Sequence, residues 1–433
     1  MTTEARKPLS LLMATALVIG NMIGSGIFLL PATMAPFGAV SLLGWAFTIA
    51  GALLLALTFS WLARARPAAG GIYAYTKLAF GDFAGFLVAW SYWISIWVTN
   101  AAIAVAMVSY LSALLPPLAQ SPVLAAALAL GTLWLLTAVN LHGVRSAGIV
   151  QVLMTLLKLA PLFLLLLFGV WQLEPAHFTP FNRTGDSLMH ATNASAAMAL
   201  WAMLGLESAS IAAGKVANPQ RNVARATLYG TSIAALITAA ACTIAMGLVP
   251  PEQLAQSNAP FADAARVVWG ETGATVMALT GAISCFGALN GWLLLQGQLP
   301  QAMAQDGLFP AFAGRENNRG VPALAIVVGS VLASLLIVLN YSGSLVSIFT
   351  FMALLATLAT LVPYLFCTMA ALLLLRDPGA VALTPLRKLL LALGFLYALW
   401  AVIGSGRDTV FWGFLLLLSG LPVYVLLQRN RAS

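Results

Sequence analysis

The sequence predicts an all-α integral membrane protein with twelve transmembrane helices, and three observations lead to this fold class. The chain has 433 residues, of which 61% are hydrophobic and only 7% are charged, whereas soluble domains carry about 25% charged residues. Twelve apolar runs have the length of about 20 residues that a spanning helix requires. Lysine and arginine flank these runs mostly on one side of the predicted membrane. Soluble enzymes, nucleic-acid-binding modules and disordered proteins are therefore excluded.

The predicted spans are bounded by charged residues, proline or glycine. They cover residues 9–30, 38–62, 83–114, 122–141, 147–171, 189–213, 227–249, 273–299, 321–340, 345–375, 386–405 and 410–428. A β-barrel is excluded, because its strands alternate over about 10 residues. The first run has no cleavage pattern, so we expect it to be a retained helix. The loops are too short for a second domain, and residues 1–433 are expected to form a single polytopic domain.

The positions of the basic residues predict the orientation in the membrane. Sixteen of the 20 lysines and arginines fall on the side of the N-terminus: Arg6, Lys7, Arg64, Arg66, Lys77, Arg145, Lys215, Arg221, Arg225, Arg315, Arg319, Arg376, Arg387, Lys388, Arg429 and Arg431. Arg183, Arg266 and Arg407 fall on the other side, and Lys158 lies within a span. Because basic loops stay in the cytoplasm, we expect both termini there and the protein in the inner (plasma) membrane. The net charge of +8 then reflects topology and requires no nucleic-acid partner.

No cofactor or metal site is expected. The cysteines lie within apolar stretches without CxxC spacing, and the histidines lie far apart near predicted loops. These residues are Cys242, Cys285, Cys367, His142, His177 and His190.

The first span contains a segment that is expected to interrupt the helix. It reads Gly20-Asn21-Met22-Ile23-Gly24-Ser25-Gly26-Ile27-Phe28, and each glycine lowers helix propensity by about 1 kcal/mol. Free backbone groups in hydrocarbon are tolerated only where they line a cavity, so the segment suits amino and carboxylate groups of a substrate. The alternative is close helix packing of the GxxxG kind, which Gly20 and Gly24 satisfy.

The sixth span carries a matching feature over Trp201–Ser210. Glu207 is the only acidic residue deep within a span, where a charged carboxylate costs about 2.5–3.5 kcal/mol. Because burial disfavours the charged form, Glu207 is a candidate proton carrier or pH switch, and a structural ion pair is the alternative.

Lys158, in the fifth span, is the obvious partner for such an ion pair. A buried lysine can also exchange its proton and stand in for a coupling cation near the first helix. The third possibility is that its side chain snorkels to the membrane interface.

Aromatic side chains are a further candidate element of a binding site, because Trp and Tyr faces attract cations by about 0.5–2 kcal/mol. Trp201 and Trp292 each stand near a glycine well within a span. Tyr92 and Asn100 share one face of the third helix, two turns apart. Core packing is the alternative for each residue alone.

Seven motifs, in this order, resemble those of the amino acid–polyamine–organocation superfamily, and most closely its bacterial basic amino acid/polyamine antiporters of the arginine:agmatine type. They are GNMIGSGIFLLP (Gly20–Pro31), GGIYAY (Gly70–Tyr75), LWAMLGLESAS (Leu200–Ser210), NPQRNVARAT (Asn218–Thr227), APFADAA (Ala259–Ala265), QDGLFP (Gln305–Pro310) and LVPYL (Leu361–Leu365). The resemblance implies a LeuT-like fold of two inverted five-helix repeats (residues 9–171 and 189–375) followed by two helices (386–428), with helices 1 and 6 broken. It also implies exchange by alternating access, membrane lipid as surroundings and a possible homodimer.

The resemblance also implies roles for individual residues. Substrate-binding residues would be Asn21, Ile23, Gly24, Ser25, Gly26, Ser95, Ile96, Asn100, Trp201, Leu204, Trp292 and Ala356. Tyr73, Tyr92, Trp201 and Tyr364 would act as gates. Glu207 and Lys158 would couple transport to protons.

The departures from the family pattern affect the expected substrate. Ile96 and Ala356 stand where the arginine exchangers present small polar groups, and Ala288 replaces a hydroxyl residue. Ser95 or Thr357 would compensate if the helices were rotated slightly. Lys158 precedes Leu-x-Pro in the fifth span, a pattern that resembles the neutral and mixed amino acid exchangers of the superfamily. Two functions therefore stay open. One is exchange of an external cationic amino acid, such as arginine, for an internal amine such as agmatine. The other is neutral or broad-range exchange, or proton-coupled uptake. An enzyme is not expected.

Overall fold

The computed structural model describes residues 9–68, 70–142, 145–340, 345–376 and 382–432. In these ranges the chain is helical, without a β-strand apart from one isolated bridge between Leu9 and Val216. The helices are α1 (Leu11–Met22), α2 (Ser25–Met34), α3 (Val40–Ala65), α4 (Ile72–Phe80), α5 (Asp82–Ser112), α6 (Pro117–Gln120), α7 (Pro122–Leu141), α8 (Arg145–Gly169), α9 (Leu188–Trp201), α10 (Ser208–Ile211), α11 (Pro219–Leu248), α12 (Pro251–Ala255), α13 (Pro260–Gln305), α14 (Ala323–Asn340), α15 (Leu345–Leu374), α16 (Pro385–Gly404), α17 (Arg407–Leu418) and α18 (Gly420–Ala432). Short 3₁₀ turns are η1 (Ala35–Phe37), η2 (Val170–Gln172), η3 (Pro175–Phe178), η4 (Ala213–Lys215) and η5 (Ala311–Gly314).

The predicted fold class of a multi-span helical membrane protein is confirmed. Ten helical segments of the described residues are long and apolar enough to cross a membrane. The predicted ninth span forms the shorter apolar helix α14, and the sixth is divided between α9 and α10. The total of twelve crossings stays a prediction.

Most boundaries agree with the predicted spans to within a few residues, and two helices are longer. α11 begins at Pro219 rather than at residue 227, and α13 begins at Pro260 rather than at residue 273. The first turns of α13 form a separate helix in physical terms, because Gly270 has a φ of +67° and bends the chain there. Glycine adopts this positive φ without steric penalty.

Several helix starts follow from local sequence. Ser121 and Ser187 precede α7 and α9, and their hydroxyls accept hydrogen bonds from the backbone N–H groups of Leu124 (3.3 Å) and His190 (3.2 Å). Such N-caps satisfy donors that a helix leaves free in its first turn. Proline occupies the first position of α7, α11, α13 and α16, where its missing N–H costs nothing.

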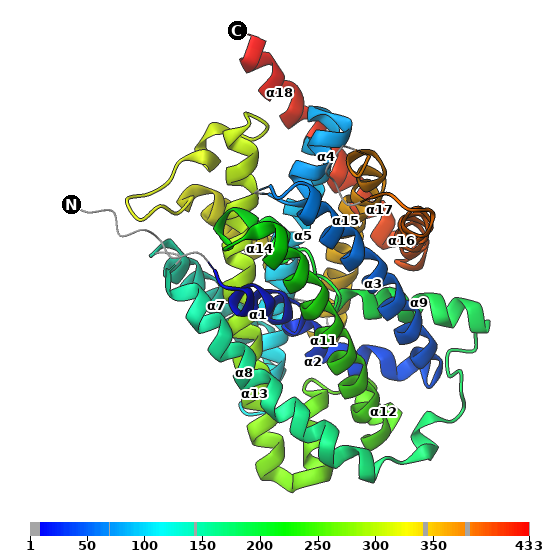
Figure 1. Cartoon of the computed structure of the whole chain (residues 1–433). Coiled ribbons are helices and arrows are strands. Elements are labelled where there is room, and N and C mark those ends of the chain that lie inside the picture. Colours follow the sequence, from blue (N-terminus) through cyan, green and yellow to red (C-terminus); the bar gives the residue numbers. More distant parts are fainter. Residues whose placement is uncertain (1–8, 69, 143–144, 341–344, 377–381, 433) are drawn as a thin grey trace.

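Helix α5 runs through the middle of the bundle and packs against both α13 and α15 (Figure 1). α5 is buried along almost its whole length, because 94% of an 18-residue apolar stretch of this helix lies inside the protein. α1 and α2 lie beside α11 and α13, and α9 lies against α3. This arrangement brings the first and sixth predicted spans together around α5 and α13.

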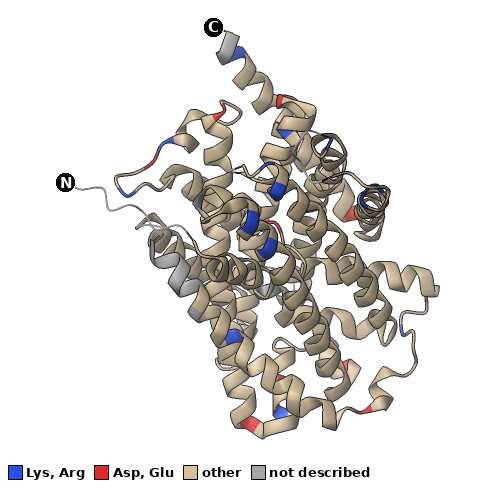
Figure 2. Ribbon diagram, viewed as in Figure 1, with Lys and Arg blue, Asp and Glu red and all other residues tan. Residues whose placement is uncertain are grey.

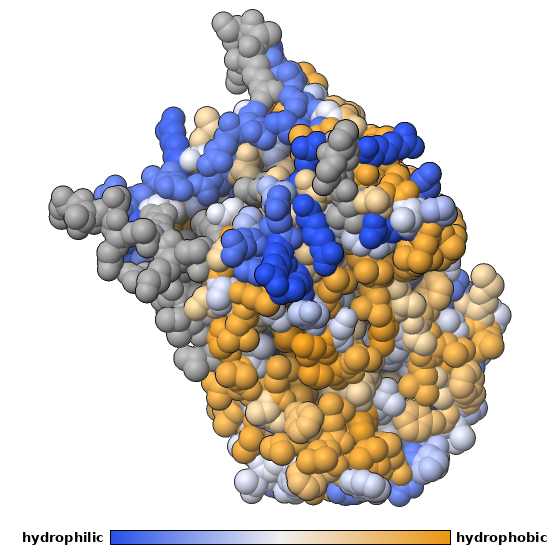
Figure 3. Space-filling view, in the orientation of Figure 1, coloured by the Kyte–Doolittle hydropathy of each residue, from blue (hydrophilic) through white to orange (hydrophobic). Residues whose placement is uncertain are grey.

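The outer surface agrees with a membrane location. Apolar side chains cover much of the visible surface (Figure 3), and many leucines of α8, α16 and α17 are exposed. Lysine and arginine gather mainly towards the end of the molecule at which α18 ends (Figure 2). This distribution is the one expected if that end faces the cytoplasm.

Candidate functional site

The first predicted span is broken where the glycines lie. α1 ends at Met22, Ile23 and Gly24 have non-helical backbone angles, and α2 begins at Ser25. A Cβ atom at Gly24 would lie only 2.5 Å from the Cβ atom of Ala288. Glycine is therefore required at this position, because the interrupted backbone packs directly against α13.

The carbonyl groups exposed at the end of α1 are satisfied by side chains from other helices. Lys158 Nζ, from α8, donates to the Gly20 carbonyl oxygen at 2.7 Å. The indole Nε1 of Trp292, from α13, lies 3.4 Å from the Asn21 carbonyl oxygen. The break is thus stabilised from two sides despite its depth in the protein.

The sixth predicted span is also broken, between α9 and α10. Residues 202–207 form consecutive tight turns, with hydrogen bonds such as that from Met203 N to the Leu200 carbonyl oxygen (2.9 Å). Gly205 has a φ of +102°, and a Cβ atom there would lie 2.9 Å from the Cβ atom of Asn21. Asn21 Nδ2 also donates to Ser208 Oγ at 2.9 Å. The two breaks therefore contact each other.

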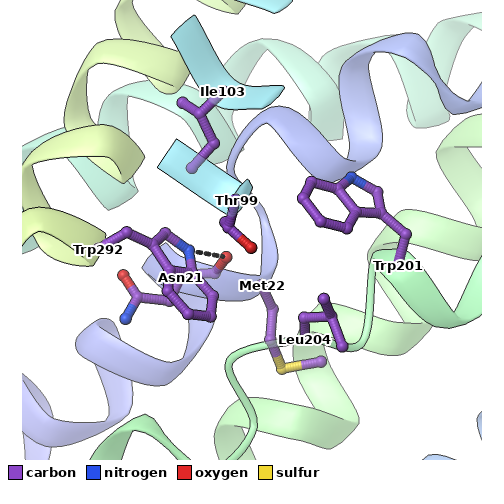
Figure 4. A pocket seen from close by; sticks show the side chains of 7 residues that line it. All are labelled: Asn21, Met22, Thr99, Ile103, Trp201, Leu204 and Trp292. Atoms are coloured by element: carbon purple, nitrogen blue, oxygen red, sulfur yellow. Dashed lines mark hydrogen bonds between the residues drawn. The ribbon is translucent and has the colours of Figure 1, made fainter. Parts of the chain in front are cut away.

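A cavity lies at the junction of the two breaks (Figure 4). Its free volume is only about 10 Å³, and it is lined by Asn21, Met22, Thr99, Ile103, Trp201, Leu204 and Trp292. None of these residues is more than 4% exposed. Ligand pockets commonly measure about 300–1,000 Å³, so this closed cavity has to widen to admit an organic solute.

The walls of the cavity combine aromatic rings with polar atoms that have no partner. The side chains of Trp201 and Trp292 line it from opposite sides (Figure 4). Asn21 Oδ1, Thr99 Oγ1 and Trp201 Nε1 are buried without a hydrogen-bond partner among the described residues. Buried polar atoms are normally paired. These groups can accept from or donate to a bound solute, and the indole faces can attract a cation.

The α2 side of the break offers backbone donors. The first turn of a helix has free N–H groups, and no side chain caps α2. Such a terminus favours an anionic group such as a carboxylate. Ser25 and Gly26 begin this helix, and the side chain of Ser25 lies outside the described part of the structure.

Glu207 lies next to the second break and is fully buried. Its two carboxylate oxygens accept hydrogen bonds from the hydroxyls of Tyr92, on α5, and Tyr364, on α15 (2.6 Å for Tyr364). The carboxylate therefore joins the α9–α10 break to two core helices, in the middle of the bundle.

Lys158 does not pair with Glu207, so the ion-pair alternative is wrong. The lysine is only 1% exposed, which also excludes snorkelling to the surface. Its ammonium group binds the backbone of α1 instead, at Gly20.

The remaining predicted site residues lie around the cavity or towards one end of the molecule. Ser95, Ile96, Asn100 and Ala356 are fully buried and do not line the cavity. Asn100 Nδ2 donates to Gln296 Oε1 on α13 (2.8 Å). Ile23 and Gly24 form the first break.

Tyr73, on α4, lies away from these residues. Its hydroxyl donates to Asp306 Oδ2 (2.7 Å), which is also 2.7 Å from Lys77 Nζ. These contacts tie α4 to the chain just beyond α13.

Three residues that line the cavity are not predicted from the sequence: Met22, Thr99 and Ile103. Met22 lies inside the glycine-rich segment next to Asn21, and this position is the signal that could have identified it as a binding residue. Thr99 and Ile103 lie one turn apart on α5, and the position of Thr99 beside Asn100 is the only hint that the sequence offers.

Comparison with known sequences places these features in a family. Residues 9–421 match the family described as amino acid permease. The chain is 31% identical to the cadaverine/lysine antiporter of Escherichia coli (strain K12), over 99% of this chain and 97% of that protein. It is 31% identical to the putrescine transporter of the same strain, over 99% and 98%. A candidate arginine/ornithine antiporter of Bacillus subtilis (strain 168) is 32% identical over 84% and 83%. The matching family and the broken helices agree, and the chain belongs to the amino acid permease family of the amino acid–polyamine–organocation superfamily.

Proposed function

We propose that this protein is a secondary active antiporter of the bacterial inner membrane that exchanges an external cationic amino acid for an internal amine. The observation that carries the proposal is the cavity between Trp201 and Trp292 at the contact of the two helix breaks. A cadaverine/lysine antiporter and a putrescine transporter are similar to this protein over almost its full length, which supports the proposal. The predicted orientation, with both termini in the cytoplasm, is part of the proposal.

The cavity supplies a partner for each end of a cationic amino acid. The free Asn21 Oδ1 accepts from the α-ammonium group, and the N–H groups at the start of α2 bind the carboxylate. The cationic end lies between Trp201 and Trp292, where each ring contributes about 0.5–2 kcal/mol. An amine without a carboxylate keeps the ammonium contacts, which explains how one site serves both partners of the exchange.

Alternating access follows from the position of the breaks. The repeats 9–171 and 189–375 each begin with a broken span, as inverted-repeat transporters do around a central site. The closed cavity corresponds to a state between the outward-open and inward-open forms. Tyr92 and Tyr364 are proposed gates, and Glu207, which accepts hydrogen bonds from both, is the proposed proton-coupling residue that links the second break to α5 and α15.

Trp292→Ala tests the assignment of the cavity. The variant is expected to lose uptake of cationic substrates in proteoliposomes, while Trp171→Ala is expected to keep it, because Trp171 is 84% exposed. Normal uptake by a folded Trp292→Ala variant would remove the cavity from the proposal.

Lys158 favours a second candidate function, proton-coupled uptake of neutral amino acids. A buried ammonium group beside the first break can stand in for a coupling cation and release a proton during the cycle. Competition separates the two functions. Leucine or methionine displaces labelled substrate if the second is correct, and cationic substrates displace it if the first is.

A further inference from the structure

The hydroxyl of Thr99 faces the cavity without a protein partner. Thr99 is 2% exposed, and its Oγ1 atom has no hydrogen bond among the described residues. Figure 4 shows the hydroxyl directed into the space between Trp201 and Trp292. Of the seven lining residues, Thr99 is the only one with a hydroxyl group.

Other threonines in the neighbouring core helix behave differently. Thr357 and Thr360 of α15 donate to the carbonyl oxygens of Ala353 (2.7 Å) and Ala356 (2.9 Å) one turn earlier. Such a bond to the preceding turn of the same helix is one way in which a buried threonine is satisfied. Thr99 makes no such bond, so its hydroxyl is available to a solute.

The two hydroxyls that sequence reasoning offered as compensation are already occupied. Ser95 Oγ shares a hydrogen bond of 2.9 Å with Thr360 Oγ1, on the side of α15. Thr357 Oγ1 bonds to its own helix. Of these three hydroxyls, Thr99 is the one that lines the cavity and has no protein partner in the described part of the chain.

The number of acceptors limits which cation fits. An ammonium group is a compact charge with three donors, whereas a guanidinium group presents five donors in one plane. Thr99 offers a single oxygen at the aromatic walls, and Asn21 Oδ1 is needed for the α-ammonium group in the proposed function. With one acceptor, a guanidinium group leaves four of its five donors without a protein partner and an ammonium group leaves two of its three. The cost of unpaired donors is therefore larger for the guanidinium group.

On this basis, and resting on the proposed function, we propose that Thr99 contacts the substrate and selects a primary ammonium group over a guanidinium group. The substrate class is then α,ω-diamines and amino acids with a terminal ammonium, such as lysine and ornithine, rather than arginine and agmatine. Asn100, one residue further on, donates to Gln296 Oε1 on α13 and does not line the cavity.

The test measures exchange selectivity in proteoliposomes loaded with unlabelled lysine. Uptake of labelled lysine and labelled arginine is followed for the wild type, Thr99→Val, Thr99→Ser and Thr357→Val. Valine preserves the shape of threonine and removes the hydroxyl, serine keeps the hydroxyl, and Thr357→Val is the matched control outside the cavity. Melting-temperature shifts with lysine, cadaverine, arginine and agmatine provide a second readout on the same purified proteins.

The wild type is expected to prefer lysine. Thr99→Val is expected to lower apparent lysine affinity about tenfold or more, because a hydrogen bond to a charged group is lost, with a much smaller change for arginine. Thr99→Ser and Thr357→Val are expected to keep the wild-type ratio. If Thr99→Val does not fold, the test rests on Thr99→Ser. A wild-type lysine-to-arginine uptake ratio, together with a wild-type melting-temperature shift with lysine, supports the proposal. A lower lysine-to-arginine ratio in Thr99→Ser overturns it.

The two proposals fail in different ways. Exchange of cations with an unchanged lysine-to-arginine ratio in Thr99→Val overturns the role of Thr99 alone. A wild type that prefers arginine overturns it as well. The absence of exchange with either cation in the wild type overturns the proposed function, and the role of Thr99 with it.

Discussion

Lys158 Nζ donates to the carbonyl oxygen of Gly20 at 2.7 Å, at the point where α1 stops being helical. The ammonium group holds one side of the first break in place from α8. A carbonyl left free by an interrupted helix is costly in the protein interior. Lys158 therefore belongs to the structure of the break itself, whether or not it also carries a proton.

Lys158→Met is expected to weaken this break. The Gly20 carbonyl would stay buried without its donor, which costs about 1–3 kcal/mol. We expect a lower melting temperature in detergent and loss of exchange. Lys388→Met, at an exposed position, is the control and should change neither. Wild-type stability and exchange in Lys158→Met would mean that the bond to Gly20 is dispensable.

Exchange is expected to depend on pH through Glu207. Protonation removes the negative charge and turns one carboxylate oxygen into a donor, so that one of the two tyrosine hydroxyls has to accept instead. Both hydrogen bonds become neutral and weaker, which loosens the gate. We therefore expect exchange to rise as the pH falls, and to be nearly independent of pH in Glu207→Gln. Transport rates between acidic and neutral pH measure this.

Two variants sharpen the interpretation of that pH profile. Tyr364→Phe keeps the carboxyl group and removes one of its donors, so it should flatten the profile only partly. Glu174→Gln changes an exposed acid and should leave the profile unchanged. A wild-type pH profile of exchange in folded Glu207→Gln would mean that Glu207 has a purely structural role.

Gly205→Ala is expected to damage the contact between the two breaks. The residue has a φ of +102°, which costs about 1–3 kcal/mol for a residue with a side chain. Its new Cβ atom would also collide with Asn21. We expect a lower melting temperature and little transport.

Gly131→Ala is the matched control for this change. Gly131 lies within α7 with no atom within 4 Å of an added Cβ, and alanine favours a helix over glycine by up to about 1 kcal/mol. The control should be as stable as the wild type or more stable. An equal effect of the two substitutions would argue against a special role for Gly205.

The breaks were predictable from sequence because glycine leaves a local signature. Gly20, Gly24 and Gly205 stand in spans that are otherwise good helices, and the structure interrupts the chain beside them. The acid next to the second break was equally visible, since Glu207 is the only acidic residue deep in a predicted span. These features depend on residue type more than on tertiary packing.

The residues of α5 that line the cavity could not be predicted in the same way. α5 is buried on almost all sides, so its hydrophobic pattern does not mark one face. Thr99 and Asn100 are neighbours in sequence but point about 100° apart around the helix axis. Only the position of α13 shows that Asn100 binds Gln296 while Thr99 faces the cavity.

Lys158 illustrates a second limit of sequence reasoning. The sequence offered one buried cation and one buried acid, and an ion pair was the simplest way to satisfy both charges. The structure satisfies them separately, through a backbone carbonyl and through two tyrosine hydroxyls. The competing partners come from helices whose relative positions are set by tertiary packing.

Counterflow in proteoliposomes tests the central claim most directly. Vesicles are loaded with unlabelled lysine, cadaverine, arginine, agmatine, leucine or buffer, and uptake of labelled lysine, arginine and leucine is measured at acidic and neutral pH. The account predicts uptake of a labelled cationic amino acid that requires an internal cationic amino acid or amine. Uptake of leucine without uptake of lysine or arginine, or uptake into vesicles that contain only buffer, would contradict it.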